Sequence, residues 1–83
     1  MYQYFFEQKA VGDIKKLPKD IQKRIIKKLD FFCSKDPLIF ACHLKNYELG
    51  TYRFRIGDYR VIFDLEEDRI IILAVGHRRE IYK

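Results

Sequence analysis

Apolar and charged residues alternate most clearly in the C-terminal third of the chain. Three segments there are rich in Tyr, Phe, Ile and Val, which favour the pleated surface of a β-strand: residues 52–56, 59–65 and 69–77. Gly57-Asp58 fits a two-residue hairpin turn, and residues 66–68 fit a longer polar turn. We therefore predict three strands joined as an antiparallel meander.

In the N-terminal half, the apolar residues follow the spacing of one strand and then of two helices. Residues 2–7 are aromatic-rich and predict a first strand, whereas the apolar positions between Lys9 and Leu17 recur at helical spacing. A second helix begins at Pro18, carries one apolar stripe and ends at Asp36-Pro37. Residues 38–50 have no clear period and predict mostly loop, with room for one short strand.

These elements predict the fold class. Two helices between a first strand and a three-strand meander indicate an α+β protein. We expect both helices to pack on one face of a small, mainly antiparallel, four-stranded sheet. Residues 1–83 are expected to form a single domain, because a chain of 83 residues supports one modest core.

Composition narrows the class of partner. The hydrophobic fraction of 48% excludes a disordered tail, and a net charge of +5 favours a polyanionic partner, although charge alone is a weak signal. The two cysteines lack metal-ligand spacing, so we interpret Cys33 and Cys42 as reduced, core-filling thiols. The apolar run at residues 2–6 is too short for a signal peptide or a membrane span, which predicts a cytoplasmic protein without a membrane partner.

The second helix also has a basic face. Its cations are Lys19, Lys23, Arg24, Lys27 and Lys28. Such a face can attract RNA or an acidic protein, but solvated basic faces are common on amphipathic helices. We favour the solvated surface.

The hairpin at residues 52–63 concentrates arginines on one face. A two-residue turn at Gly57-Asp58 places Arg55 opposite Arg60, with Arg53 on the same side of the ribbon. The other face is a plain core set: Tyr52, Phe54, Ile56, Tyr59, Val61 and Phe63. Like charges directly opposite each other cost roughly 0.2–1 kcal/mol, and a bound phosphate reverses that sign.

Two interpretations of these arginines remain. They either form an anion site, or they extend into water or pair with Asp58, Asp64 or Glu66. We favour the anion site, because the strand geometry brings three guanidinium groups together.

The C-terminal tail adds candidates. Strand alternation places either His77 or Arg78 on the arginine face. His77 is interpreted equally well as a hydrogen-bonded residue at the strand end or as a functional residue. Tyr82 is interpreted equally well as a residue that packs on a helix or as a functional residue. His43 is expected at the surface or in packing, because no metal-ligand spacing surrounds it.

In this order and spacing, the segments resemble the RelE/ParE superfamily of toxins from toxin–antitoxin systems. The resemblance covers nearly the whole chain and is most specific at residues 52–63 and 75–82. It implies a cognate antitoxin as partner. RelE-type members cleave mRNA in the ribosomal A site without a metal or other cofactor. ParE-type members instead poison DNA gyrase and typically lack the Arg and Tyr of the tail.

The resemblance also implies roles for individual residues. Arg53 and Arg55 match two basic strand positions, and Arg60 matches the arginine that contacts the scissile phosphate. Arg78 and Tyr82 match the arginine and the terminal tyrosine of the active site. Keeping all of these favours the RNA-cleaving branch over gyrase inhibition. A degenerate module that only binds an antitoxin is the third alternative.

RNA supplies its own nucleophile in the 2′-OH, so cleavage needs orientation, charge stabilisation and proton transfer. The arginines would hold the phosphate. RelE-type chemistry can use a lysine at the position of Arg55 as the general base, but arginine stays protonated and makes a poor base. His77 titrates in the required range and is our first candidate for the base, and Glu48 is a distant one.

Overall fold

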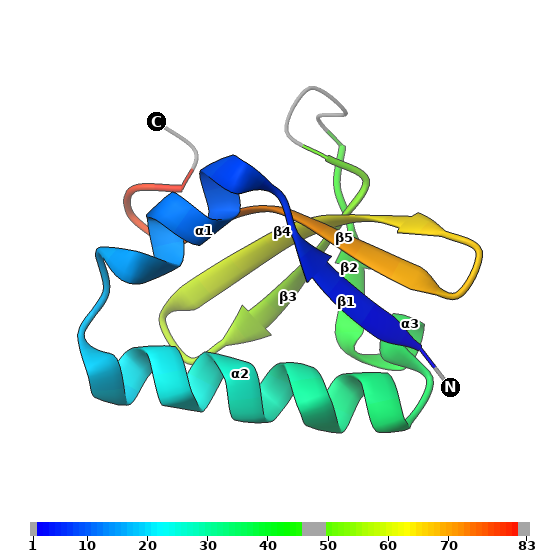
Figure 1. Cartoon of the computed structure of the whole chain (residues 1–83). Helices are drawn as coiled ribbons and strands as arrows, with labels where there is room; N and C mark the ends of the chain where they lie inside the picture. Colours follow the sequence, from blue (N-terminus) through cyan, green and yellow to red (C-terminus); the bar gives the residue numbers. More distant parts are fainter. Residues whose placement is uncertain (1, 46–49, 82–83) are drawn as a thin grey trace.

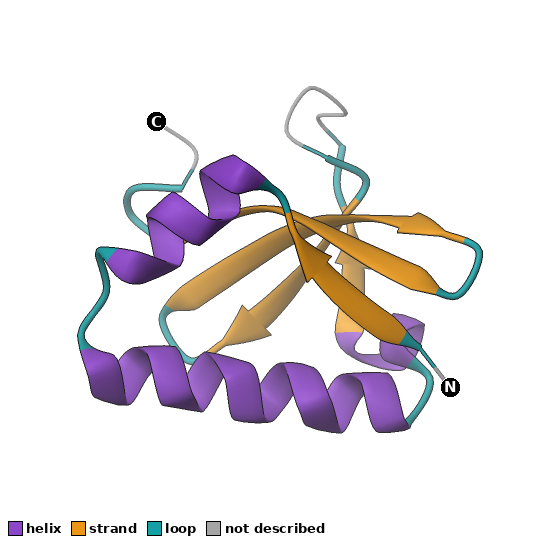
Figure 2. Ribbon diagram, viewed as in Figure 1, coloured by secondary structure: helices purple, strands orange, loops and turns teal. Residues whose placement is uncertain are grey.

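A computed structural model describes residues 2–45 and 50–81. Helices lie below and beside one twisted sheet (Figures 1 and 2). The elements in chain order are β1 (Gln3–Phe6), α1 (Gln8–Lys15), α2 (Lys19–Ser34), α3 (Pro37–Phe40), β2 (Ala41–His43), β3 (Tyr52–Ile56), β4 (Tyr59–Glu66) and β5 (Arg69–His77). The α+β class is confirmed.

The sheet has five strands in the order β1-β5-β4-β3-β2, one more than the four predicted. β1 pairs with β5 in parallel, and the other pairs are antiparallel. The additional strand is β2, where Ala41 pairs with Phe54 and His43 pairs with Tyr52. Three residues are too few to show an alternating pattern, so β2 forms through its pairing with β3 rather than through a local signal.

Both long helices pack on the same face of the sheet, as predicted. Ala10 from α1 and Leu29 from α2 are fully buried in one cluster with Phe54 and Phe63 of the sheet. The Asp13 carboxylate ties α1 to the sheet by accepting a hydrogen bond from the backbone N–H of Val75 at 3.0 Å. The core set predicted for the hairpin therefore lies on the helix-covered face.

Asp36-Pro37 ends α2 and also begins α3. The Asp36 carboxylate accepts a hydrogen bond from the backbone N–H of Leu38 at 3.1 Å, which caps the new helix, and Pro37 occupies its first turn. The prediction of loop directly after residue 37 was therefore wrong. An Asp-Pro pair stops a preceding helix and is equally suited to start the next one.

The second face of the sheet is partly covered by the segment that returns to β3. Gly50 lies directly on Ile62, where an added Cβ would come within 2.6 Å of the isoleucine Cγ2. Asp64 holds this segment by accepting hydrogen bonds from both the backbone N–H and the hydroxyl of Thr51, each at 2.8 Å. Leu44 is also buried, and Ile62 is fully buried although it does not belong to the main core cluster.

The two cysteines differ. Cys33 is buried in the core, as predicted, and its burial raises the pKa of its thiol. Cys42 is exposed on β2 opposite Arg53, so the prediction that it fills the core was wrong. The parity of β2 directs Cys42 to the face away from the helices. Among the described helices, none combines the length and apolarity needed to cross a bilayer.

Candidate nucleic-acid interface

The β3–β4 hairpin has the register predicted from the sequence. Arg55 lies directly opposite Arg60, and Arg53 lies opposite Ile62. Because cross-strand partners share a face, these three arginines are on the face away from the helices. They differ in exposure: Arg55 is exposed, Arg53 is half-buried and Arg60 is buried.

A tight turn closes this hairpin. Gly57 has φ +61°, whereas Asp58 does not have a positive φ, and this combination fits a type II′ turn with glycine in its first central position. This turn matches the right-handed twist of the two strands, so it fixes the register that aligns Arg55 with Arg60.

The Arg60 guanidinium is held by this turn. Its Nη1 donates hydrogen bonds to the carbonyl oxygens of Gly57 and Tyr59, both at 3.0 Å. Only 7% of Arg60 is exposed. The repulsion between the Arg55 and Arg60 charges is therefore reduced, because Arg60 turns towards backbone carbonyls and Arg55 extends into solvent.

The C-terminal tail folds back over the strand partner of Arg60. Gly76 is the β5 partner of Arg60, and an added Cβ on Gly76 would lie 3.1 Å from Cδ1 of Ile81. Ile81 therefore packs on the arginine face beside Arg60. A side chain in place of Gly76 would push this part of the tail away.

Arg78 reaches the same turn from the tail. Its backbone N–H donates to the carbonyl of Asp58 at 2.7 Å, and its Nε lies 3.7 Å from the Asp58 carboxylate. Both side chains are more than half exposed, at 51% and 65%. An ion pair this exposed contributes about 0–1 kcal/mol, so a phosphate can compete for Arg78.

Asp58, Asp64 and Glu66 were the carboxylates proposed as alternative partners of the hairpin arginines, and each has a neighbour of its own. Asp64 binds Thr51, and Asp58 lies beside Arg78. Glu66 is at the far end of β4, where it is opposite Arg69.

His77 faces the helix side of the sheet rather than the arginines. It is opposite Tyr59, with the two rings in edge contact at a centroid distance of 5.4 Å. Its Nδ1 accepts a hydrogen bond from the backbone N–H of Arg79 at 3.1 Å, which places the proton of the neutral ring on Nε2. A role as general base would require this ring to give up that bond. Arg78 follows the end of β5, and its side chain lies beside Asp58 at the β3–β4 turn.

Two further candidates, Tyr82 and Glu48, lie outside the described residues. His43 makes an edge contact with Tyr52 at a centroid distance of 5.1 Å, in keeping with a packing role. Across residues 2–45 and 50–81, no three of the His, Cys, Asp and Glu side chains gather closely enough to hold a metal ion.

The sequence placed Arg24 only on the basic face of the second helix, and its contact with the hairpin was not predicted. A Cβ added to Gly57 would lie 2.7 Å from the Arg24 Nη2, so this α2 side chain rests on the hairpin turn. The turn reaches towards the N-terminal half of α2 in Figure 1. No local pattern could reveal this contact, because it depends on how α2 crosses the sheet.

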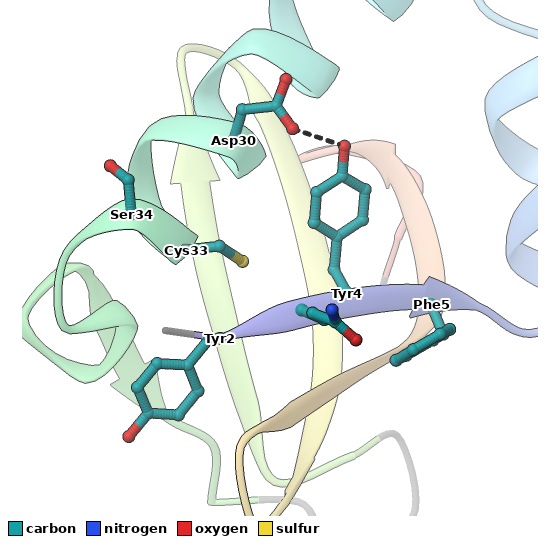
Figure 3. Close-up of a pocket in the computed structure, with 7 residues that line it drawn as sticks. Tyr2, Tyr4, Phe5, Asp30, Cys33 and Ser34 are labelled. Atoms are coloured by element: carbon teal, nitrogen blue, oxygen red, sulfur yellow. Dashed lines mark hydrogen bonds between the residues drawn. The ribbon is translucent and has the colours of Figure 1, made fainter.

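A separate groove of about 380 Å³ lies between β1 and the C-terminal half of α2 (Figure 3). The Tyr4 hydroxyl crosses it to donate a 2.7 Å hydrogen bond to Asp30. Burial, this hydrogen bond and the charge of Asp30 raise the pKa of Tyr4 to about 12. The groove is formed by β1 and α2, which do not carry Arg53, Arg55, Arg60 or Arg78, here called the arginine cluster.

Known proteins share this sequence and fold. A family model described as the ParE toxin of the type II toxin–antitoxin system parDE matches residues 4–82. Toxin RelG of Mycobacterium tuberculosis is 30% identical over 99% of this chain and 97% of its own length. Toxin RelE3 of Methanocaldococcus jannaschii is 32% identical over 93% of this chain and 91% of its own length.

Solved structures agree. The toxin–antitoxin complex RelBE2 of Mycobacterium tuberculosis contains a chain with a TM-score of 0.82 and 29% identity, covering 93% of this chain and 98% of that one. The RelB–RelE complex of Methanococcus jannaschii gives 0.71 and 32%, covering 95% of each chain. The chain belongs to the RelE/ParE family, the toxins of type II toxin–antitoxin systems.

Proposed function

We propose that this toxin is a metal-independent endoribonuclease that cleaves mRNA on the ribosome and so inhibits translation. The observation that carries the proposal is that Arg55, Arg60 and Arg78 all lie at the end of the β3–β4 hairpin that carries the turn. The turn holds Arg60 by two carbonyls and Arg78 through Asp58, while Arg55 is the cross-strand neighbour of Arg60.

Such a cluster is suited to a phosphodiester. Guanidinium groups make paired, charge-assisted hydrogen bonds to anionic oxygens and stabilise the charge that develops when the 2′-OH attacks phosphorus. Arg60 is fixed before substrate arrives, and Arg55 and Arg78 are exposed and able to contact it. In this scheme Arg53 binds the phosphate backbone further along β3, and the resemblance to RelE-type toxins assigns Tyr82 to the active site.

The solved relatives are complexes named RelBE or RelB–RelE, described as toxin–antitoxin or antitoxin–toxin complexes. By analogy, we propose that a cognate antitoxin binds this chain and suppresses its activity in the cytoplasm. Gyrase inhibition is the rival activity, because the matching family model is named for ParE.

The test compares two double variants after induction in cells. Arg55→Ala/Arg78→Ala removes two exposed charges from the site, whereas Arg69→Ala/Lys35→Ala removes two exposed charges elsewhere. Primer extension on cellular mRNA should show new 5′ ends with the wild type and the control pair, and a loss of at least about 100-fold with the site pair.

The same proteins should be added to a DNA supercoiling assay. Gyrase inhibition by wild-type protein that leaves mRNA intact would replace the nuclease with the rival activity. Equal mRNA cleavage by both double variants would show that the arginine cluster is not the site.

A further inference from the structure

We propose that the exposed face of α2 is a second RNA-binding surface, which continues the arginine site around the β3–β4 turn. The inference rests on the proposed function, because the polyanion it names is the single-stranded RNA that the arginine site would cleave. Four residues form the surface, here called the α2 track: Arg24, Lys27, Lys28 and Phe31.

The track is one continuous stripe. Its residues are spaced i, i+3, i+4 and i+7, which places them on one face of a helix over about 10 Å of its length. Together they line a shallow groove of about 350 Å³. The stripe begins at Arg24 and ends near the C-terminal end of α2.

Arg24 connects this stripe to the arginine site. Its guanidinium rests on Gly57, and the carbonyl of Gly57 accepts the hydrogen bond from Arg60. Arg24 on the helix side and Arg60 on the sheet side therefore flank the same turn residue. A strand bound at the exposed Arg55 can pass around the hairpin tip to Arg24, because the Asp58 carboxylate at the tip is paired with Arg78.

Phe31 adds an exposed aromatic ring to the groove, which a purely solvated basic face would not have. Its side chain is 47% exposed, and the Lys28 ammonium lies 6.0 Å from the centre of its ring. Neighbouring rings support it, since Phe40 lies at a centroid distance of 5.6 Å and Phe32 at 6.2 Å. An exposed ring beside cations is the arrangement on which single-stranded bases stack while lysines hold the backbone.

Binding is tested with a fluorescent single-stranded RNA of about 12 nucleotides, a length within the range of known single-strand sites. Lys27→Ala/Lys28→Ala removes two charges from the track, and Lys15→Ala/Lys16→Ala removes two exposed charges from the end of α1 as the matched control. The track variant should bind more weakly and lower the slope of log affinity against log salt by about 1.4, while the control keeps the wild-type slope.

Phe31→Leu tests stacking separately, because it keeps an apolar side chain but removes the ring. Binding should weaken about 5- to 100-fold, with an unchanged circular dichroism spectrum. RNA carrying 4-thiouridine should photo-crosslink to Phe31 or its helical neighbours. Crosslinks confined to β3, β4 and the tail would overturn the proposal.

The outcomes separate this inference from the proposed function. Track variants that bind and cleave RNA like the control would overturn the α2 track while the nuclease stands. Wild-type protein that binds RNA through the track but never cleaves it would support the track and remove the nuclease. Track variants that keep RNA binding but lose a co-expressed acidic antitoxin would overturn the proposal in favour of a protein-docking surface.

Discussion

Arg60 keeps a charged guanidinium group almost completely out of water. Burying a charge is costly unless hydrogen bonds compensate it, and Arg60 obtains two of them from the Gly57 and Tyr59 carbonyls. These bonds also fix its orientation before any substrate binds. Such preorganisation is what electrostatic stabilisation of a transition state requires.

Replacing this group with lysine should therefore affect stability. Arg60→Lys keeps the charge but loses the planar fork that reaches two carbonyls, so the free energy of unfolding should fall by about 1–3 kcal/mol in a urea titration. Arg55→Lys, on the exposed cross-strand neighbour, should change it by less than about 0.5 kcal/mol. Equal effects of the two substitutions would mean that the carbonyl contacts do not stabilise the fold.

Replacing Arg55 with lysine should also change the pH dependence of cleavage. Arginine stays protonated, whereas a lysine at position 55 would lie opposite the positive charge of Arg60, which favours its neutral form. Arg55→Lys should therefore give a cleavage rate that rises more steeply with pH than the wild-type rate. Parallel pH–rate profiles for the two proteins would exclude a proton-accepting role at this position.

The sequence predicted which residues share the arginine face, because strand alternation and a two-residue turn determine register. It did not predict the burial of Arg60 or the packing of Ile81 over Gly76, the β5 partner of Arg60. It also did not predict the hairpin contact of Arg24, which is far from the hairpin in sequence. Contacts between elements need the tertiary arrangement, and no local pattern carries that information.

At the scale of elements, short pieces were the hardest to predict. β2 has three residues and α3 has four, so neither shows a period. The longer strands and helices followed their patterns closely. The β3–β4 turn is the element that matters most, since it positions Arg60, Arg78 and Arg24 together.

Two glycine substitutions test the importance of this turn. Gly57→Ala forces a side chain into a backbone with φ +61° and against Arg24, so it should lower the free energy of unfolding by about 1 kcal/mol or more. Gly12→Ala in α1 meets no atom within 4 Å and should raise it by about 0.4–1 kcal/mol. Thermal unfolding of the two variants measures both, and shifts of the same sign would contradict this account of the turn.

At the scale of the whole molecule, α1 and α2 bury one face of the sheet and leave the arginine cluster on the hairpin tip. The Tyr4–Asp30 hydrogen bond ties β1 to α2 at the opposite side of the core. The Tyr4–Asp30 contact can therefore be altered without touching the arginines of the proposed site.

That contact predicts how stability changes in alkali. The pKa of Tyr4 is about 12 in the folded protein against 10.0 ordinarily, so its stabilising contribution is complete below pH 10 and is lost as pH rises towards 12. Asp30→Asn removes the neighbouring charge and should lower the pKa of Tyr4. Ultraviolet titration of the phenolate checks this shift, and an unchanged midpoint would contradict it.

The most direct test of the proposed chemistry uses the substrate itself. An mRNA carrying a single 2′-deoxynucleotide at a mapped cleavage position is translated in an extract with the wild-type protein. If the arginine cluster promotes attack by the 2′-OH, the deoxy position stays intact, while the all-ribose mRNA is cut to a product ending in a 2′,3′-cyclic phosphate. Cleavage at the deoxy position, or no cleavage of either mRNA, would contradict the account.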